Sequence, residues 1–154
     1  MGANWIVEVI VAYLHFVSVL GLAGLLTAEL LMYRRELTPA TARLLRRVDS
    51  FYGGVAGVVL LTGLARVFWV GKGASFYLGN PMFHALWIVF VVVALLSIIP
   101  TKHFLHWGKA PADGHAPSIS EATYKRVRRV LLVEIHLLAI IPILAVLMAR
   151  GIGN

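Results

Sequence analysis

Cysteine is absent from the 154 residues, and charged side chains are scarce. Without cysteine the chain cannot form disulfides, hold thiolate-ligated iron–sulfur clusters or four-thiolate zinc sites, use a cysteine nucleophile, or attach haem covalently. Only 14% of the residues are charged, whereas 60% are hydrophobic. Soluble domains carry about a quarter charged residues, so this chain has too few polar side chains to cover a surface in water. The sequence therefore predicts an integral membrane protein.

Long apolar stretches are what the chain has instead. Four of them are long enough to cross a bilayer, which takes about 20 residues of helix. They lie near residues 5–33, 50–70, 82–101 and 130–149. No soluble domain and no internal repeat is evident, so residues 1–154 form a single transmembrane domain. We expect an all-α integral membrane protein whose four transmembrane helices form an antiparallel bundle.

Acidic residues are few, 7 against 14 Lys and Arg, and the formal charge is +7. The basic residues are segregated: 11 of the 14 follow the first or the third span. By the positive-inside rule those two segments are cytoplasmic and both termini lie outside. The charge therefore predicts topology and contact with the lipid bilayer, not nucleic-acid binding. The 11 residues are Arg34, Arg35, Arg43, Arg46, Arg47, Lys102, Lys109, Lys125, Arg126, Arg128 and Arg129.

Ionisable residues within the spans are where function is expected. A charged side chain near the bilayer centre costs about 2.5–3.5 kcal/mol on insertion scales. In the first span Glu8, His15 and Glu29 are separated by 7 and 14 residues, so they share one helix face. Leu22 fills the remaining position in this row. We expect this polar stripe to face the other helices rather than lipid.

Two histidines are candidates for the metal ligands of a haem b. Counted at the 1.5 Å rise per residue, His15 lies ~15 Å and His136 ~21 Å from the outer boundary. Neutral imidazoles at similar depth on facing helices commonly hold haem b within a bundle. His84 is a second ligand only if the third helix is tilted or displaced. Alternatively, His15 merely hydrogen-bonds a hydroxyl such as that of Thr62 or Tyr52.

The other ionisable residues fall into two groups by depth. Glu8, Arg66 and His84 are expected to lie together near the outer boundary. Glu29 and Glu134 are expected near the level of the inner basic residues. The sequence thus predicts polar groups toward both ends of the bundle.

Three further patterns concern histidine. Glu134 and His136 are about 200° apart around a helix, so only one of them can face the bundle centre. His103 and His106, spaced i and i+3, can share a metal ion, with His115 as a third ligand. No carboxylate completes that site, and the alternative is that these histidines face lipid headgroups.

Small residues predict packing and capping. Gly53 and Gly57 form a Gly-x-x-x-Gly pair, which lets two helices approach closely. The sequence leaves open whether this is an internal packing face or the seam of a homodimer. Ser118 and Glu121 are spaced as a capping box at the start of the helix that leads into the fourth span.

Several motifs along the chain are typical of one family. They are Tyr13-Leu-His15, Ala28-Glu-Leu30, Arg46-Arg-Val-Asp49, Leu61-Thr-Gly-Leu-Ala-Arg-Val-Phe68, Gly71-Lys-Gly-x-x-Phe-Tyr77, Asn80-Pro81 and Met148-Ala-Arg-Gly151. With them nearly the whole chain resembles a family of bacterial membrane proteins, the domain of unknown function 2214. This resemblance carries no activity, and with the four spans it implies a multi-pass protein of the bacterial inner (cytoplasmic) membrane.

A more distant likeness is to the HemJ-type protoporphyrinogen oxidases, small four-helix membrane proteins that bind haem b. In that family the histidine of the first span is a candidate haem ligand, which implies this role for His15. The family also has a lysine two residues after the histidine of the third span, where this chain has Leu86, so porphyrin oxidation is less well supported than haem binding. The likeness uses Leu14-His15, Leu61-Thr-Gly-Leu64, Phe83-His-Ala85 and Val133-Glu134.

Three functions fit these observations. The leading one is a haem-b-binding protein for electron transfer or porphyrin oxidation, with His15 and either His136 or His84 as axial ligands. The second is a non-enzymatic accessory subunit of a larger respiratory or photosynthetic membrane complex. The third is a proton- or metal-handling transporter, built from Glu8, His15, Glu29, Arg66 and Glu134.

Overall fold

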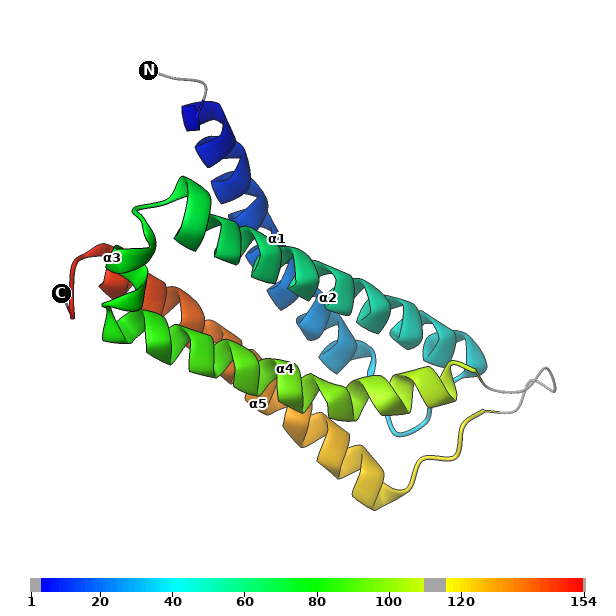
Figure 1. Ribbon diagram of the computed structural model, residues 1–154. Helices are drawn as coiled ribbons and strands as arrows, with labels where there is room; N and C mark the ends of the chain where they lie inside the picture. Colours follow the sequence, from blue (N-terminus) through cyan, green and yellow to red (C-terminus); the bar gives the residue numbers. More distant parts are fainter. Residues whose placement is uncertain (1–3, 110–115, 154) are drawn as a thin grey trace.

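The computed structural model describes residues 4–109 and 116–153, which fold into four long helices and shorter helical turns, with no strand among them. Each long helix contains a stretch long and apolar enough to cross a membrane. Successive long helices run in opposite directions (Figure 1). The expected all-α antiparallel bundle is confirmed. Its elements are α1 (Asn4–Met32), α2 (Pro39–Ala65), the π-helical turn η1 (Arg66–Val70), α3 (Ala74–Leu78), α4 (Pro81–Trp107) and α5 (Glu121–Ala149).

The bundle has two different ends. We call the end with the α1–α2 and α4–α5 connections the basic end, and the end with α3 the terminal end (Figure 1). At the basic end α2, α4 and α5 run beyond the expected spans, whereas α1 ends within its own. α2 already begins at Pro39, and α5 at Glu121. The physical reason is capping: Thr38 accepts a hydrogen bond from the backbone of Thr41 at 3.1 Å and Pro39 suits the first turn, so the helix starts before the chain becomes apolar.

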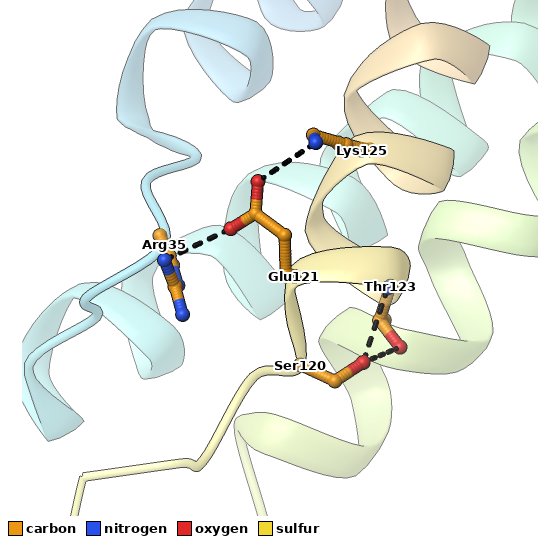
Figure 2. Close-up of polar contacts among 5 residues, drawn as sticks. All are labelled: Arg35, Ser120, Glu121, Thr123 and Lys125. Atoms are coloured by element: carbon orange, nitrogen blue, oxygen red, sulfur yellow. Dashed lines mark hydrogen bonds and ion pairs between the residues drawn. The ribbon is translucent and has the colours of Figure 1, made fainter.

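The start of α5 differs from the predicted capping box. Ser120, not Ser118, is the N-cap, and its Oγ accepts a hydrogen bond from a first-turn backbone N–H at 3.1 Å. Glu121 is then the first helical residue, and its carboxylate lies 2.9 Å from the guanidinium of Arg35 (Figure 2). The prediction was wrong because a second serine lies closer to the helix, and because the arginine draws the carboxylate away from the backbone.

The largest group of buried apolar side chains lies toward the basic end. Its centre is Tyr33, whose ring is 5.8 Å from that of Trp107 and 5.7 Å from that of Phe104, measured between centroids. Burial, with Tyr124 nearby, raises the pKa of the Tyr33 hydroxyl above its usual range, so this group stays protonated. A smaller apolar cluster around Phe83 closes the terminal end. Tyr77 and Phe83 of this smaller cluster also line the cavity described next.

Candidate functional site

A cavity of about 380 Å³ opens in the terminal half of the bundle. This volume is in the range of small-molecule sites, about 300–1,000 Å³. Three basic side chains line it, namely those of His15, Arg66 and Lys72. The rest of the wall is apolar or aromatic, and includes Phe16, Phe76, Tyr77, Phe83, Leu86, Trp87, Phe90 and Pro142. The cavity can therefore receive a flat apolar molecule that carries negative charge at one edge.

His15 on α1 is held by Thr62 on α2. The Nδ1 atom of His15 lies 3.0 Å from Thr62 Oγ1, and that hydroxyl donates to the carbonyl of Val58 at 2.6 Å. A hydroxyl has one hydrogen, so Thr62 must accept from His15. Nδ1 of His15 therefore carries a hydrogen, so the lone pair of a neutral imidazole lies on Nε2, which makes no hydrogen bond among the described residues. The bond to Thr62 is the one that the alternative interpretation of His15 predicts, and it engages Nδ1 alone.

The glycine beside Thr62 gives the imidazole ring its room. A Cβ atom at Gly63 would lie 3.4 Å from His15 Cε1, which is tighter than an ordinary van der Waals contact. The ring therefore lies directly against the backbone of α2. This close approach, together with the Thr62 hydrogen bond, orients the imidazole.

The two cations lie just beyond the end of α2. Arg66 begins η1, and its guanidinium carbon is 5.0 Å from the centroid of the Phe16 ring. Lys72 follows η1, with Nζ 4.5 Å from the centroid of the Phe76 ring. In the described ranges neither side chain is in an ion pair. Both cations are thus available to an anionic group at the cavity.

The other two candidate ligands do not reach this cavity. His136 is exposed on α5, with Nδ1 2.6 Å from the carbonyl oxygen of Leu132. His84 is exposed on α4, with Nε2 2.9 Å from the carbonyl oxygen of Leu78. Equal depth along two helices does not bring side chains together, because the rotation of each helix about its axis also matters. The structure therefore presents His15 alone to the cavity.

The polar stripe of α1 faces the bundle only in part. Glu29 is buried and His15 is half-buried, but Glu8 is exposed. The reason is that the first turns of α1 project away from the other helices (Figure 1). Within the described part of the chain, no hydrogen bond or ion pair joins Glu8, Arg66 and His84. The expected polar group near the outer boundary does not form.

A second polar group lies nearer the basic end, and all four long helices contribute to it. The carboxyls of Glu29, Asp49 and Glu134 are 1%, 4% and 0% exposed. Thr101 donates to Asp49 Oδ1 at 2.7 Å, and Ser97 Oγ lies 2.6 Å from Glu134 Oε1. Asp49 was missed in the sequence, since it lies two residues after the pair Arg46 and Arg47 and resembles a surface residue. The hydroxyls that α4 carries at the same level are the signal that could have revealed it.

Burial of Glu134 agrees with its angular separation from His136, which faces outward on the opposite side of α5.

The predicted histidine metal site has less support from the geometry. His103 stacks on Trp107 with 5.0 Å between ring centroids, and His115 lies outside the described residues. Across 4–109 and 116–153, no three His, Asp or Glu side chains are placed to share a metal ion.

A family model described as "Predicted membrane protein (DUF2214)" matches residues 7–153. The chain belongs to this family. The resemblance to the domain of unknown function 2214 is thereby confirmed. Membership of this family, together with the four apolar helices, establishes a membrane protein that lies in a lipid bilayer. None of the curated proteins and none of the solved structures compared with this DUF2214 protein matches it.

Proposed function

We propose that this DUF2214 protein binds haem b in the cavity of its terminal half, with His15 as the axial ligand. The observation that carries the proposal is the orientation of His15. Its Nδ1 hydrogen is held by Thr62, and its Nε2 has no hydrogen-bond partner among residues 4–109 and 116–153. Histidines that ligate metals almost always donate their other ring hydrogen to a fixed acceptor in this way.

The rest of the cavity fits the same group. Its aromatic and aliphatic wall would suit a porphyrin plane, and Arg66 and Lys72, which line the cavity, would bind the two propionates. When bound, haem supplies a redox-active iron for electron transfer or porphyrin oxidation. The chain's own residues hold the imidazole neutral, bind the carboxylates and exclude water. Because His136 and His84 face outward, the proposal uses one axial histidine.

The experiment is a reduced-minus-oxidised visible spectrum of detergent-purified protein from haem-replete cells. We expect Soret and α bands in the natural protein, their loss in His15→Ala, and their retention in His84→Ala and His136→Ala. The latter two are matched controls, since both histidines are exposed. A natural protein without a Soret band, or a His15→Ala variant that keeps it, would overturn the proposal. Loss of the bands in either control would overturn the single-histidine arrangement.

A second candidate function is that of an accessory subunit, within a larger membrane complex or a homodimer. It is favoured by the glycine seam of α2, which we define as Gly53 and Gly57. A Cβ atom at either position would meet nothing within 4 Å, so the seam is not an internal packing face. Glycine pairs at this spacing let a second transmembrane helix approach closely. The seam therefore leaves room for a helix of another chain.

A further inference from the structure

Three buried carboxyls lie in the bundle without a cationic partner. Glu29 lies within electrostatic range of both Asp49 and Glu134. The ion pairs in the described part of the chain instead join Glu121 to two basic side chains at the surface. An ionised carboxylate in a low-dielectric interior is strongly disfavoured unless a positive charge accompanies it. The cluster must therefore carry protons in place of cations.

The groups around these carboxyls are neutral. Every long helix contributes at least one oxygen-bearing side chain. Within the described ranges, no lysine, arginine or histidine is ion-paired or hydrogen-bonded to the three acids. Arg46 on α2 and His103 on α4 lie nearer the basic end. The facing groups are Glu29 and Tyr33 on α1, Asp49 and Tyr52 on α2, Ser97 and Thr101 on α4, and Glu134 on α5.

Only one hydroxyl binds Glu134 in the described residues. Ser97 Oγ donates to Glu134 Oε1 at 2.6 Å, and it also lies 2.9 Å from the carbonyl oxygen of Val93 and 3.3 Å from the Tyr52 hydroxyl. Glu134 Oε2 is buried without a hydrogen-bond partner among the described residues. An ionised carboxylate with a single neutral donor and no cation is strongly disfavoured in a low-dielectric interior. The geometry thus favours the protonated form of Glu134.

Glu29 and Asp49 differ in how their carboxyls are hydrogen-bonded. Glu29 makes no hydrogen bond or ion pair with the described residues, and its Oε1 is fully buried without a partner, as is Glu134 Oε2. Asp49 accepts from Thr101 at 2.7 Å, and at 4% it is the most exposed of the three. If one carboxyl of the three is ionised, it is Asp49. Glu29 and Glu134 then hold protons.

We propose that Glu29, Asp49 and Glu134 form an intramembrane proton-binding site, in which Glu29 and Glu134 are protonated at neutral pH and exchange their protons with water at the basic end. Glu29 is one turn from the end of α1, which makes this the shorter route to water. The site is separate from the proposed haem cavity and does not depend on it. The ligand is the proton, because the described residues hold no set of three side chains suited to a metal ion.

The test is infrared spectroscopy of the detergent-purified protein, which detects the C=O stretch of protonated carboxylic acids. We expect this band at neutral pH, weakened in Glu29→Gln and in Glu134→Gln, and nearly lost in the double variant. Glu36→Gln is the matched control, because Glu36 is an exposed carboxyl in the α1–α2 connection. The band should fall as the pH is raised and shift on transfer to D₂O.

Each other outcome overturns the proposal. A band that is absent at neutral pH, or unchanged in both variants, means that these carboxyls hold no proton. A band that neither titrates nor shifts in D₂O means a sealed structural cluster. A band abolished when sodium chloride replaces choline chloride at constant pH means a metal-ion site. Glutamine has the shape of protonated glutamic acid, so both variants should have the same unfolding temperature as the natural protein. A large fall in that temperature means that the carboxyls are ionised.

Discussion

Thr62 and Ser97 hold the side chains that they face through hydroxyls that also lie near a backbone carbonyl of their own helix. Thr62 donates to Val58 and so receives the hydrogen of His15 Nδ1. Ser97 lies 2.9 Å from the carbonyl oxygen of Val93 and donates to Glu134 Oε1 at 2.6 Å. Hydroxyls that bond to the preceding helical turn are common in membrane helices. In this bundle they position the imidazole of one polar site and a carboxyl of the other.

The role of Thr62 can be tested at the residue scale. Thr62→Val keeps the shape of the side chain but removes the acceptor for His15 Nδ1, so the imidazole loses its orientation. We expect haem affinity to fall by about 10–100-fold, the usual effect of removing a group that orients a metal ligand. Haem titration of the apoprotein, followed by Soret absorbance, measures this.

Thr62→Ser is the matched control, because it keeps the hydroxyl and should retain most of the affinity. If the Thr62→Val variant binds haem as tightly as the Thr62→Ser variant, the hydrogen bond does not orient the ligand.

Among the elements, α2 carries parts of three different features. Its first half supplies Asp49 to the carboxyl cluster, its middle carries Gly53 and Gly57, and its second half supplies Thr62 to the cavity. These features point in different directions, since the glycines are open to the outside while the two polar residues face other helices. A single helix thus serves the interior and an exterior seam.

The glycine seam gives a prediction at this scale. Gly53→Leu and Gly57→Leu place large side chains in open space, so the isolated chain should fold normally, whereas a second helix could no longer approach. We expect both variants to raise the monomer fraction in native gels and after crosslinking in mild detergent. Gly24→Leu on α1 is the control, since a Cβ atom there also meets nothing within 4 Å. A natural protein that runs only as a lone monomer would contradict the second candidate function.

Across the whole molecule, apolar packing is unevenly distributed. The larger core lies toward the basic end and the cavity opens in the terminal half, while the carboxyls lie on the same helix faces as core residues such as Leu26, Tyr52 and Leu131. At the basic end Glu121, the first residue of α5, pairs with Arg35 in the α1–α2 connection and with Lys125 on its own helix (Figure 2). We infer that the basic end is cytoplasmic, because of the positive-inside rule. The haem cavity would then lie near the outer surface and the proton site nearer the cytoplasm.

The absence of cysteine makes this orientation testable. Glu36→Cys lies in the α1–α2 connection and Ser75→Cys in α3, and both positions are exposed. We expect a membrane-impermeant maleimide to label Ser75→Cys in cells with a permeable outer layer but an intact inner membrane. Glu36→Cys should be labelled only after that membrane is opened. The opposite pattern would place both termini in the cytoplasm, and labelling of both in intact cells would contradict a single orientation.

Much of the fold and part of the candidate site could be predicted from the sequence. Apolar length determined the four helices, and the spacing along α1 correctly placed Glu29 inside the bundle. The spacing along α5 predicted only that one of Glu134 and His136 faces the bundle centre, and the structure places Glu134 there. The start of α5 was predicted two residues early, because two serines of equal chemistry lie close together. Asp49 escaped notice because it lies at the end of a stretch with several arginines, while its neighbours in space include a hydroxyl of α4.

The sequence by itself determined the membrane location, the number of helices, the family and the presence of polar groups in the interior, since hydropathy and charge act locally along the chain. Tertiary structure alone decided which polar groups meet. Depth follows from counting residues along an axis, but the direction of a side chain depends on how each helix is rotated by packing. That rotation turns His136 outward, brings His15 to Thr62, and gathers three carboxyls from three helices around the hydroxyls of a fourth.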